Sequence, residues 1–294
     1  MTVQATTSPR GSLAKQEMSN YLRSKLFWVG LVLTILAYAQ QFFFPDESGE
    51  QFGAVWLGLA IAAGIGVFGI GVMAGLVRRS DRLASAAGAS ALSEADRTRA
   101  LACAVVVPGA AGFLLWVIEV VGFYVQGYDV PHAFDGVTDG HILAFTFGQG
   151  VMASIGGPLL GLVAARYLHF RGMAVLLSVS MIVVTILMQG IFQATMSWRM
   201  VWVWTQWAGP VGRDGDVLGG DDAFGLFPGS PYFWTLYLAA VCVLGVLTAL
   251  HHDPEADRSA IRTAIVVTGI VAAALAVCAI AFGLDAVIVN PIAQ

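Results

Sequence analysis

Residues 77–101, with the sequence VRRSDRLASAAGASALSEADRTRAL, form the longest polar stretch between the first two apolar segments and the rest of the chain. The stretch holds five arginines, at positions 78, 79, 82, 97 and 99, and the segments on either side of it are long and apolar. Short loops rich in Lys and Arg stay on the cytoplasmic side of a membrane during insertion. We therefore interpret this stretch as a cytoplasmic loop that sets the orientation of the whole chain.

The composition is that of an integral membrane protein. Of the 294 residues, 57% are hydrophobic and only 12% are charged. Apolar runs close to the length of about 20 residues that a membrane span requires recur seven times. The predicted spans are 27–44, 52–77, 101–125, 142–165, 173–192, 233–250 and 265–282. We expect an all-α polytopic fold in which residues 26–294 form the transmembrane domain.

The first 25 residues are predicted to be a tail followed by a short amphipathic helix on the membrane surface. Apolar residues fall at helical spacing, and polar residues lie opposite them. The apolar set is Ala14, Met18, Tyr21 and Leu22, and the polar set is Lys15, Gln16, Asn20 and Arg23.

The distribution of charge predicts the orientation. With seven spans, thirteen of the fifteen Lys and Arg residues fall on the side of the arginine-rich stretch, and eleven of the nineteen acids fall on the other side. The positive-inside rule then predicts a cytoplasmic N-terminus and an extracytoplasmic C-terminus. Because Arg is used far more than Lys in a chain rich in Ala, Gly and Val, we expect a bacterial plasma membrane.

The sequence lacks the common catalytic and nucleotide-binding motifs. Neither lysine follows glycine in a Walker A pattern, so a P-loop is excluded, and H-E-x-x-H, G-x-S-x-G and C-x-x-C are absent. Residues 64–69 form a G-x-G-x-x-G, but they lie inside an apolar span, where glycines favour close helix packing. The three cysteines, one to a span, are interpreted as packing residues. We expect no catalytic residue, no metal and no cofactor bound by this chain.

Two histidines and two acids before the fourth span form a metal-like cluster, made of His132, Asp135, Asp139 and His141. Their spacing matches no metal template, so solvated residues that cap a helix start are the favoured interpretation. Ser93 followed by Asp96 predicts another capped helix start. His251 and His252 are interpreted as interfacial residues at a helix end.

Glu119 is the only ionisable side chain well inside a predicted span, and an intramembrane acid is a functional-site hypothesis by default. Several glutamines lie at similar depth in the outer halves of other spans, namely Gln40, Gln41, Gln149, Gln189 and Gln193. Two interpretations stay open, a polar cavity lined by these residues or glutamines that reach the headgroups. Residues 195–231, which hold four of the eight tryptophans, are either an interfacial aromatic belt or a re-entrant pair of helices.

Three junctions resemble a known family. The segment RSKLFWVG at 23–30, where the amphipathic helix enters the first span, is similar to the membrane subunits of type-2 ABC exporters. The RRSDR segment at 78–82, continuing to Arg97, resembles that family's connection between spans two and three. The segment GSPYFWTLYL at 229–238 is similar to such permeases from high-GC bacteria.

The resemblance implies an ATPase subunit on a separate chain, with ATP and Mg bound there, and a second permease copy. In the family, the interface helix and the loops after spans two and four dock on the ATPase. The corresponding coupling residues would be Arg23, Arg78, Arg79, Asp81, Arg82, Glu94, Arg97, Arg166 and Arg171. Gln40, Glu119, Gln149, Gln189 and Gln193 would lie on the substrate path. Membrane lipids are expected contacts, and nucleic acid is not.

We therefore predict the permease subunit of an ABC exporter for a lipophilic or peptide-like compound. One alternative is a membrane enzyme or accessory factor that uses Glu119 with His132 or His141. Another is a proton-coupled secondary transporter, which the lack of an obvious inverted repeat disfavours.

Overall fold

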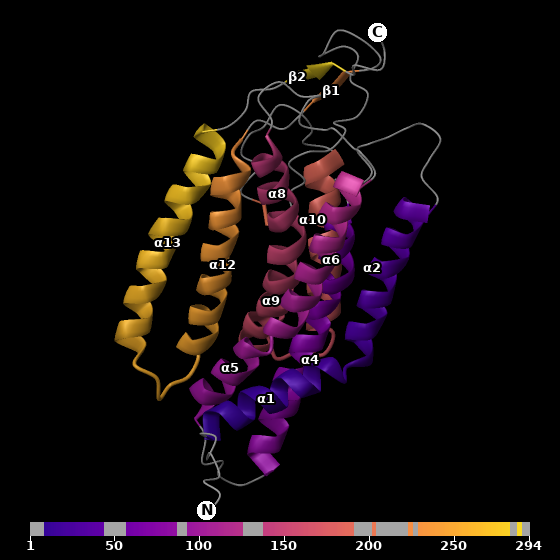
Figure 1. Ribbon diagram of the computed structural model, residues 1–294. Coiled ribbons are helices and arrows are strands. Elements are labelled where there is room, and N and C mark those ends of the chain that lie inside the picture. Colours follow the sequence, from indigo (N-terminus) through magenta and orange to yellow (C-terminus); the bar gives the residue numbers. More distant parts are fainter. Residues whose placement is uncertain are drawn as a thin grey trace, which may run out of the picture.

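The computed structural model describes residues 9–43, 57–86, 93–125, 138–190, 202–203, 223–225, 229–282 and 287–289. It confirms an all-α polytopic membrane protein, built as a bundle of long apolar helices with a short helix across one end (Figure 1). Within the described residues, six helical segments are long and apolar enough to cross a membrane. The fifth predicted span is also helical, as α10 (Met173–Gly190), and its apolar part, Met173–Met188, is shorter.

Two helical segments form the centre of the bundle. The first runs through α3 (Leu57–Ile61), the π-helical η2 (Ala62–Val67) and α4 (Phe68–Ala86). The second runs through α8 (Asp139–Phe147), the π-helical η3 (Gly148–Met152) and α9 (Ala153–Tyr167). In the apolar windows of these segments, 72% and 67% of the residues are buried inside the protein, so both are shielded from lipid.

The other helices surround this pair. They are α2 (Lys25–Phe43), α6 (Val106–Val125), α10, α12 (Pro231–His251) and α13 (Arg258–Ala281). Only 11% of the α13 window is buried, and α13 packs mainly on α12 at the edge of the bundle (Figure 1). Large apolar side chains remain exposed on α2, α6 and α10, where lipid would cover them.

Glycine allows the central helices to approach closely, as the G-x-G-x-x-G segment suggested. A methyl group at Gly64 would collide with Thr34 and with the carbonyl of Gly30 on α2. A methyl group at Gly157 on α9 would collide with the backbone of Gly66. The glycines therefore serve helix packing on two sides of η2.

The arginine-rich stretch is more helical than predicted. The helix of the second span continues past residue 77 to the end of α4, so Arg78, Arg79 and Arg82 lie on a helix rather than in a loop. The third span is preceded by α5 (Glu94–Cys103), which is separated from α6 by a break at Ala104 and Val105. The backbone N–H of Asp96 donates to Ser93 Oγ (3.1 Å), which confirms the predicted cap of α5.

The amphipathic helix is present as α1 (Pro9–Leu22), which lies across one end of the bundle and packs on α5 (Figure 1). Its buried face differs from the prediction. Tyr21 is buried as predicted, but Glu17 and Asn20 are buried as well, and Leu22 is 46% exposed. Because α1 rests on the polar ends of α4 and α5, polar side chains can be buried there, and Asn20 Nδ2 donates to Glu17 Oε2 (3.0 Å).

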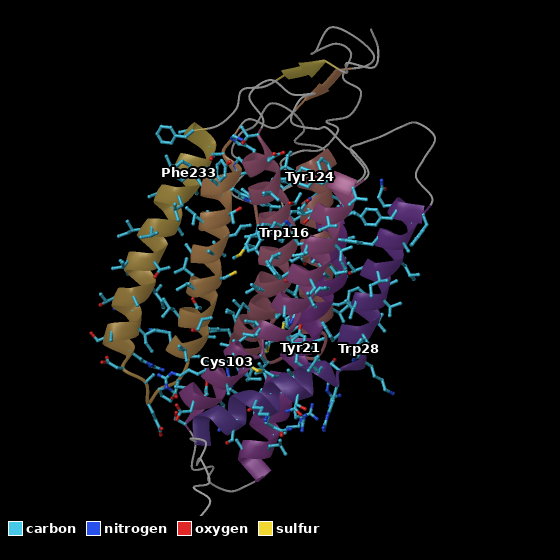
Figure 2. The ribbon with its side chains drawn as sticks, viewed as in Figure 1. Tyr21, Trp28, Cys103, Trp116, Tyr124 and Phe233 are labelled. Atoms are coloured by element: carbon cyan, nitrogen blue, oxygen red, sulfur yellow. The ribbon has the colours of Figure 1, made fainter. Side chains whose placement is uncertain are left out.

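The corner between α1 and α2 is held by Trp28, whose Nε1 donates to the carbonyl of Leu22 (2.7 Å). Figure 2 shows Tyr21 beneath the bundle and charged side chains gathered at the same end. Two short strands, β1 (Ala223–Gly225) and β2 (Val287–Val289), pair antiparallel at the opposite end (Figure 1).

Candidate functional site

Glu119 is buried between helices near the end of the bundle that carries the strands. Its side chain is 2% exposed and points into the protein rather than toward lipid. The hydroxyl of Tyr38 on α2 donates to Glu119 Oε2 (3.0 Å), and the backbone N–H of Gly58 on α3 is directed at the same carboxyl. Three separate segments of the chain therefore meet at this acid.

Gln149 lies on the other side of Gly58. It belongs to η3 and is 1% exposed. A methyl group at Gly58 would stand 2.8 Å from Gln149 Oε1, so a larger residue there would displace the Gln149 side chain. Among the described residues, Gln149 Oε1, Gln149 Nε2 and Glu119 Oε1 find no hydrogen-bond partner of ordinary geometry. Unsatisfied buried polar atoms are rare and commonly mark a site for water, an ion or a ligand.

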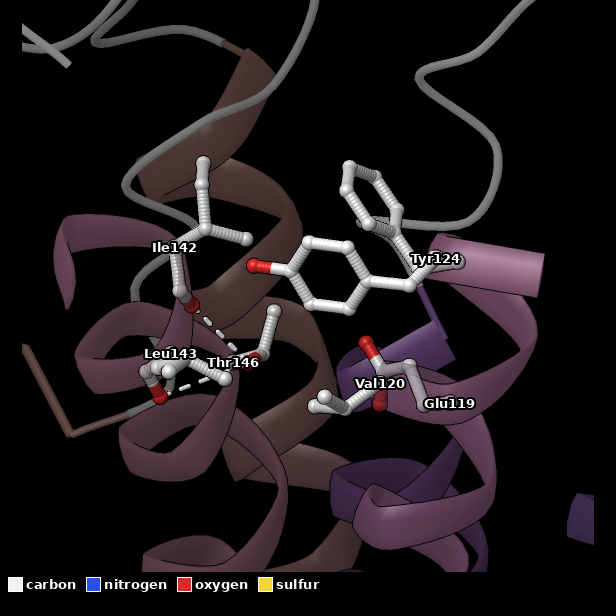
Figure 3. A pocket seen from close by; sticks show the side chains of 7 residues that line it. Glu119, Val120, Tyr124, Ile142, Leu143 and Thr146 are labelled. Carbon is white, nitrogen blue, oxygen red and sulfur yellow. Dashed lines mark hydrogen bonds between the residues drawn. The ribbon is translucent and has the colours of Figure 1, made fainter. Parts of the chain in front are cut away.

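A small cavity adjoins Glu119 on the side facing α8 (Figure 3). Glu119, Tyr124, Leu143 and Thr146 are among its lining residues, and its volume is about 10 Å³. Thr146 uses its hydroxyl within its own helix, donating to the carbonyl of Ile142 (2.9 Å), and also accepts from Trp116 Nε1 (2.9 Å). The volume provides room for about one water molecule, and not for an organic compound.

The predicted substrate-path residues separate in the structure. Glu119 and Gln149 both lie beside Gly58, but Gln40 is exposed on α2, because its side chain lies on the outer face of that helix. Tyr38, two residues earlier, occupies the inward position instead. The side chain of Gln189 and the whole of Gln193 lie outside the described residues. Sequence reasoning missed Tyr38, although its hydroxyl lies one helical turn after Thr34 in the same span.

A wider apolar groove lies between α2 and α6. Its volume is about 670 Å³, and Tyr38, Phe42, Leu115, Val117 and Gly122 are among the lining residues. A methyl group at Gly122 would collide with the ring of Phe42, so the two helices touch at that point. Tyr38 thus contributes both to this groove and to the contact with Glu119.

The opposite end of the bundle holds a network of charged side chains centred on Arg166. This residue, at the end of α9, is 3% exposed, and its Nη1 is 2.8 Å from Asp81 Oδ1 on α4. The same Nη1 is 3.8 Å from Glu94 Oε1 on α5. Arg97 Nη2 lies 3.9 Å from Asp81 Oδ1. The network therefore joins the ends of α4, α5 and α9.

The turn between α12 and α13 joins the same network. His252 Nδ1 is 2.6 Å from Glu94 Oε1, and the backbone N–H of Ala95 donates to Asp253 Oδ2 (2.6 Å). Asp253 is 2% exposed, and its carboxylate accepts from the first turn of α5. The backbone N–H groups at a helix start have no partner within the helix, so a carboxylate is favourable there. His252 lies at the end of α12, as predicted, and also contacts Glu94, a pairing that no motif in the sequence indicated.

The predicted coupling residues divide into two groups. Asp81, Glu94, Arg97 and Arg166 contact one another inside this end of the bundle. Arg23, Arg79, Arg82 and Arg171 are exposed around it. Arg78 lies between the groups, and its Nη2 donates to the carbonyl of Phe170 (3.3 Å). We call the exposed set, Arg23, Arg79, Arg82 and Arg171, the arginine rim.

His141 caps α8, as the favoured interpretation proposed. The backbone N–H of Thr138 donates to His141 Nδ1 (3.2 Å), and the ring packs against Tyr232 at a centroid distance of 4.9 Å. Asp139 is exposed, and His132 and Asp135 lie outside the described residues. Within the part of the chain that the structure describes, no group of three His, Cys, Asp or Glu side chains could hold a metal ion.

The tryptophan-rich segment falls mostly outside the described residues, so the belt and re-entrant interpretations are both untested. Trp202 is described, and its Nε1 donates to Thr185 Oγ1 on α10 (3.1 Å). Comparisons with models of known families, with curated proteins and with solved structures each give no match.

Proposed function

We propose that this chain is the permease subunit of an ATP-driven ABC exporter in a bacterial plasma membrane, with its N-terminus cytoplasmic and its C-terminus extracytoplasmic. The observation that carries the proposal is the charged end of the bundle. There α1 lies crosswise, the Arg166 network joins four helical segments, and the arginine rim surrounds them.

This end suits a docking surface that transmits force. The buried guanidinium of Arg166 pairs with partly exposed acids on two other helices, so breaking these pairs would leave a buried charge without compensation. A partner that bound the arginine rim would therefore move α4, α5, α9 and the α12–α13 turn together. By the predicted spans, the side of the bundle that holds the rim and the network carries thirteen of the fifteen Lys and Arg residues, which supports a cytoplasmic location.

The groove between α2 and α6 supports a lipophilic cargo. Its volume falls in the range of small-molecule sites, about 300–1,000 Å³, and its lining is almost entirely apolar. The exposed apolar faces of α2 and α6 are also available to a second permease copy. Closure of the ATPase would then change the gap between α2 and α6 and release the compound.

The test is purification of the tagged chain from its own host, followed by assay of ATP hydrolysis in the eluate. We expect a co-purifying P-loop ATPase, identified by mass spectrometry, at a stoichiometric amount. The triple variant Arg79→Glu, Arg82→Glu, Arg171→Glu should insert normally. The amount of ATPase that co-purifies with it should fall at least ten-fold.

The matched control is Arg262→Glu, because Arg262 is exposed on α13 at the same end but away from the rim. It should retain the ATPase. Purification of the folded parent chain without any ATPase, or equal retention by the triple variant and the control, would contradict the proposed docking.

A proton-coupled secondary transporter is the second candidate, and the burial of Glu119 beside unsatisfied polar atoms favours it. Reconstituted parent chain without ATP distinguishes the two functions. Uptake or release driven by a pH gradient alone would favour the secondary transporter. An enzyme that pairs Glu119 with His141 is disfavoured, because the His141 ring packs on Tyr232 of α12.

A further inference from the structure

We propose that Glu119 and Tyr38 form a binding site for a single small cation, in the first place a proton, which exchanges with the extracytoplasmic side through the cavity beside Glu119. The site shares Tyr38 with the cargo groove, but the cavity beside Glu119 has none of the groove's lining residues. Its assignment to the outer side rests on the proposed orientation, whereas cation binding can be measured on the purified chain alone.

The charge balance around Glu119 requires a cation. Burying an isolated carboxylate is costly, so such a group takes up a proton, a cation or a charged partner. No Lys or Arg occurs in α3, η2, α6, α8 or η3, and the single one in α2 is Lys25 at the far end of that helix. The titratable groups on the packed elements are Tyr38 on α2, Tyr124 on α6, and Asp139 and His141 on α8. The described residues therefore supply no permanent positive charge at this depth.

The hydrogen-bonding groups around the carboxyl suit a proton, or a small cation that binds oxygen ligands. Tyr38 donates to Oε2, while Oε1 is unsatisfied. A protonated Oε1 would donate one hydrogen bond, and a water in the cavity beside Glu119 could accept it. A bound cation would take the same oxygens as ligands.

The small volume of the cavity beside Glu119 limits the ligand to a proton or a small cation. The cavity of about 10 Å³ admits about one water, which excludes amines and cargo molecules. Figure 3 shows the carboxyl of Glu119 and the ring of Tyr124 directed into the space between α6 and α8. Tyr124 also has a hydrogen-bonding contact with Asp139, which is exposed at the start of α8. This line of polar groups leads from the buried acid to the bundle end.

The exchange step is simple to balance. The O–H bond at Glu119 Oε1 breaks, the proton passes to a water in the cavity, and the carboxylate stays bound to the Tyr38 hydroxyl. Uptake is the reverse. A cation that replaces the proton would bind with release of that proton.

The experiment is infrared difference spectroscopy of the purified chain in vesicles of phosphatidylglycerol and phosphatidylethanolamine, titrated upward from about pH 6.5, where ordinary Asp and Glu side chains are already ionised. We expect one carbonyl band of a protonated carboxylic acid that disappears with rising pH and is absent in Glu119→Gln. Glu17→Gln, which alters a buried acid on α1, should keep the band. Tyr38→Phe should keep the band but shift its frequency, because a hydrogen bond to the carboxyl is lost.

Two further measurements complete the test. Addition of sodium at constant pH separates the ligands: loss of the band with sodium but not with potassium chloride assigns a sodium site that competes with the proton. Leu143→Phe, which fills the cavity, should slow hydrogen–deuterium exchange of the band at least ten-fold, whereas Leu187→Phe on the exposed face of α10 should not. Identical spectra of the parent and Glu119→Gln at every pH and in both salts would overturn the proposal. If Leu143→Phe does not slow hydrogen–deuterium exchange of the band, the proposed exchange route through the cavity is wrong. Neither result bears on ATPase docking.

Discussion

The hydroxyl of Tyr38 and the carboxyl of Glu119 are joined by a hydrogen bond of 3.0 Å, in which Tyr38 donates to Oε2. This bond ties α2, of whose apolar window only 22% is buried, to the interior of the bundle. Closer to the charged end, α2 is held by the approach of Gly30 to Gly64. A second hydrogen bond, from Thr34 Oγ1 to the carbonyl of Ala60 (3.2 Å), also joins α2 to the central helices. Polar contacts and one close backbone approach therefore help to hold a helix whose other face is exposed to lipid.

Tyr38→Phe should destabilise the protein by about 1–3 kcal/mol, the usual cost of leaving a buried polar group without its partner. The measurement is thermal unfolding in detergent. In Tyr38→Phe combined with Glu119→Leu, both partners of the bond are removed, and part of the loss should be recovered. If the stability loss of the double variant equals the sum of the losses of the two single variants, the two side chains are not energetically coupled.

Arg166 and Asp81 should be strongly coupled. Removing one partner of a buried ion pair typically costs about 3–5 kcal/mol, but Asp81 is 44% exposed, so water can partly compensate it and we expect less, about 1–3 kcal/mol. A double-mutant cycle with Arg166→Met and Asp81→Asn measures the coupling by unfolding. Arg99→Met with Asp96→Asn, a pair with an exposed arginine on α5, is the control and should show less than about 1 kcal/mol. A coupling no larger than that of the control would contradict a structural role for the network.

Gly157→Ala should disrupt the packing of α9 on η2, because the added methyl group would collide with the backbone of Gly66, which cannot rotate away. We expect a clear loss of thermal stability and of folded yield. Gly75→Ala on α4 is the matched control, since the methyl group there would meet nothing within 4 Å, and it should be neutral or slightly stabilising. Normal stability of Gly157→Ala would show that the helices can separate at little cost.

Reporter fusions should locate the two ends of α13 on opposite sides of the membrane. A reporter inserted after Glu255, in the turn beside the charged network, should give a cytoplasmic signal, and one fused after Gln294 an extracytoplasmic signal. The physical reason is the positive-inside rule applied to the side that carries most arginines. A cytoplasmic signal from both positions would contradict the seven-span topology and indicate an even number of spans.

The sequence by itself determined the class of the fold and the grouping of the charges. Long apolar runs define membrane helices because backbone polar groups in lipid must be satisfied within the helix, and these runs need no information from elsewhere in the chain. The cap at Ser93 and the glycines of residues 64–69 were likewise readable, because capping and close packing depend on local residue types. The prominence of Glu119 followed from its charge within an apolar run.

Only the tertiary structure decided which side chains meet. Whether an inward position on α2 is taken by Tyr38 or by Gln40 depends on the rotation of that helix, and a shift of two residues turns a side chain to a different face. The pairing of Glu94 with His252 joins positions 158 residues apart in the chain. Such contacts arise from the packing of helices, which local patterns do not encode, and they convert the separate arginines and acids of the sequence into one network.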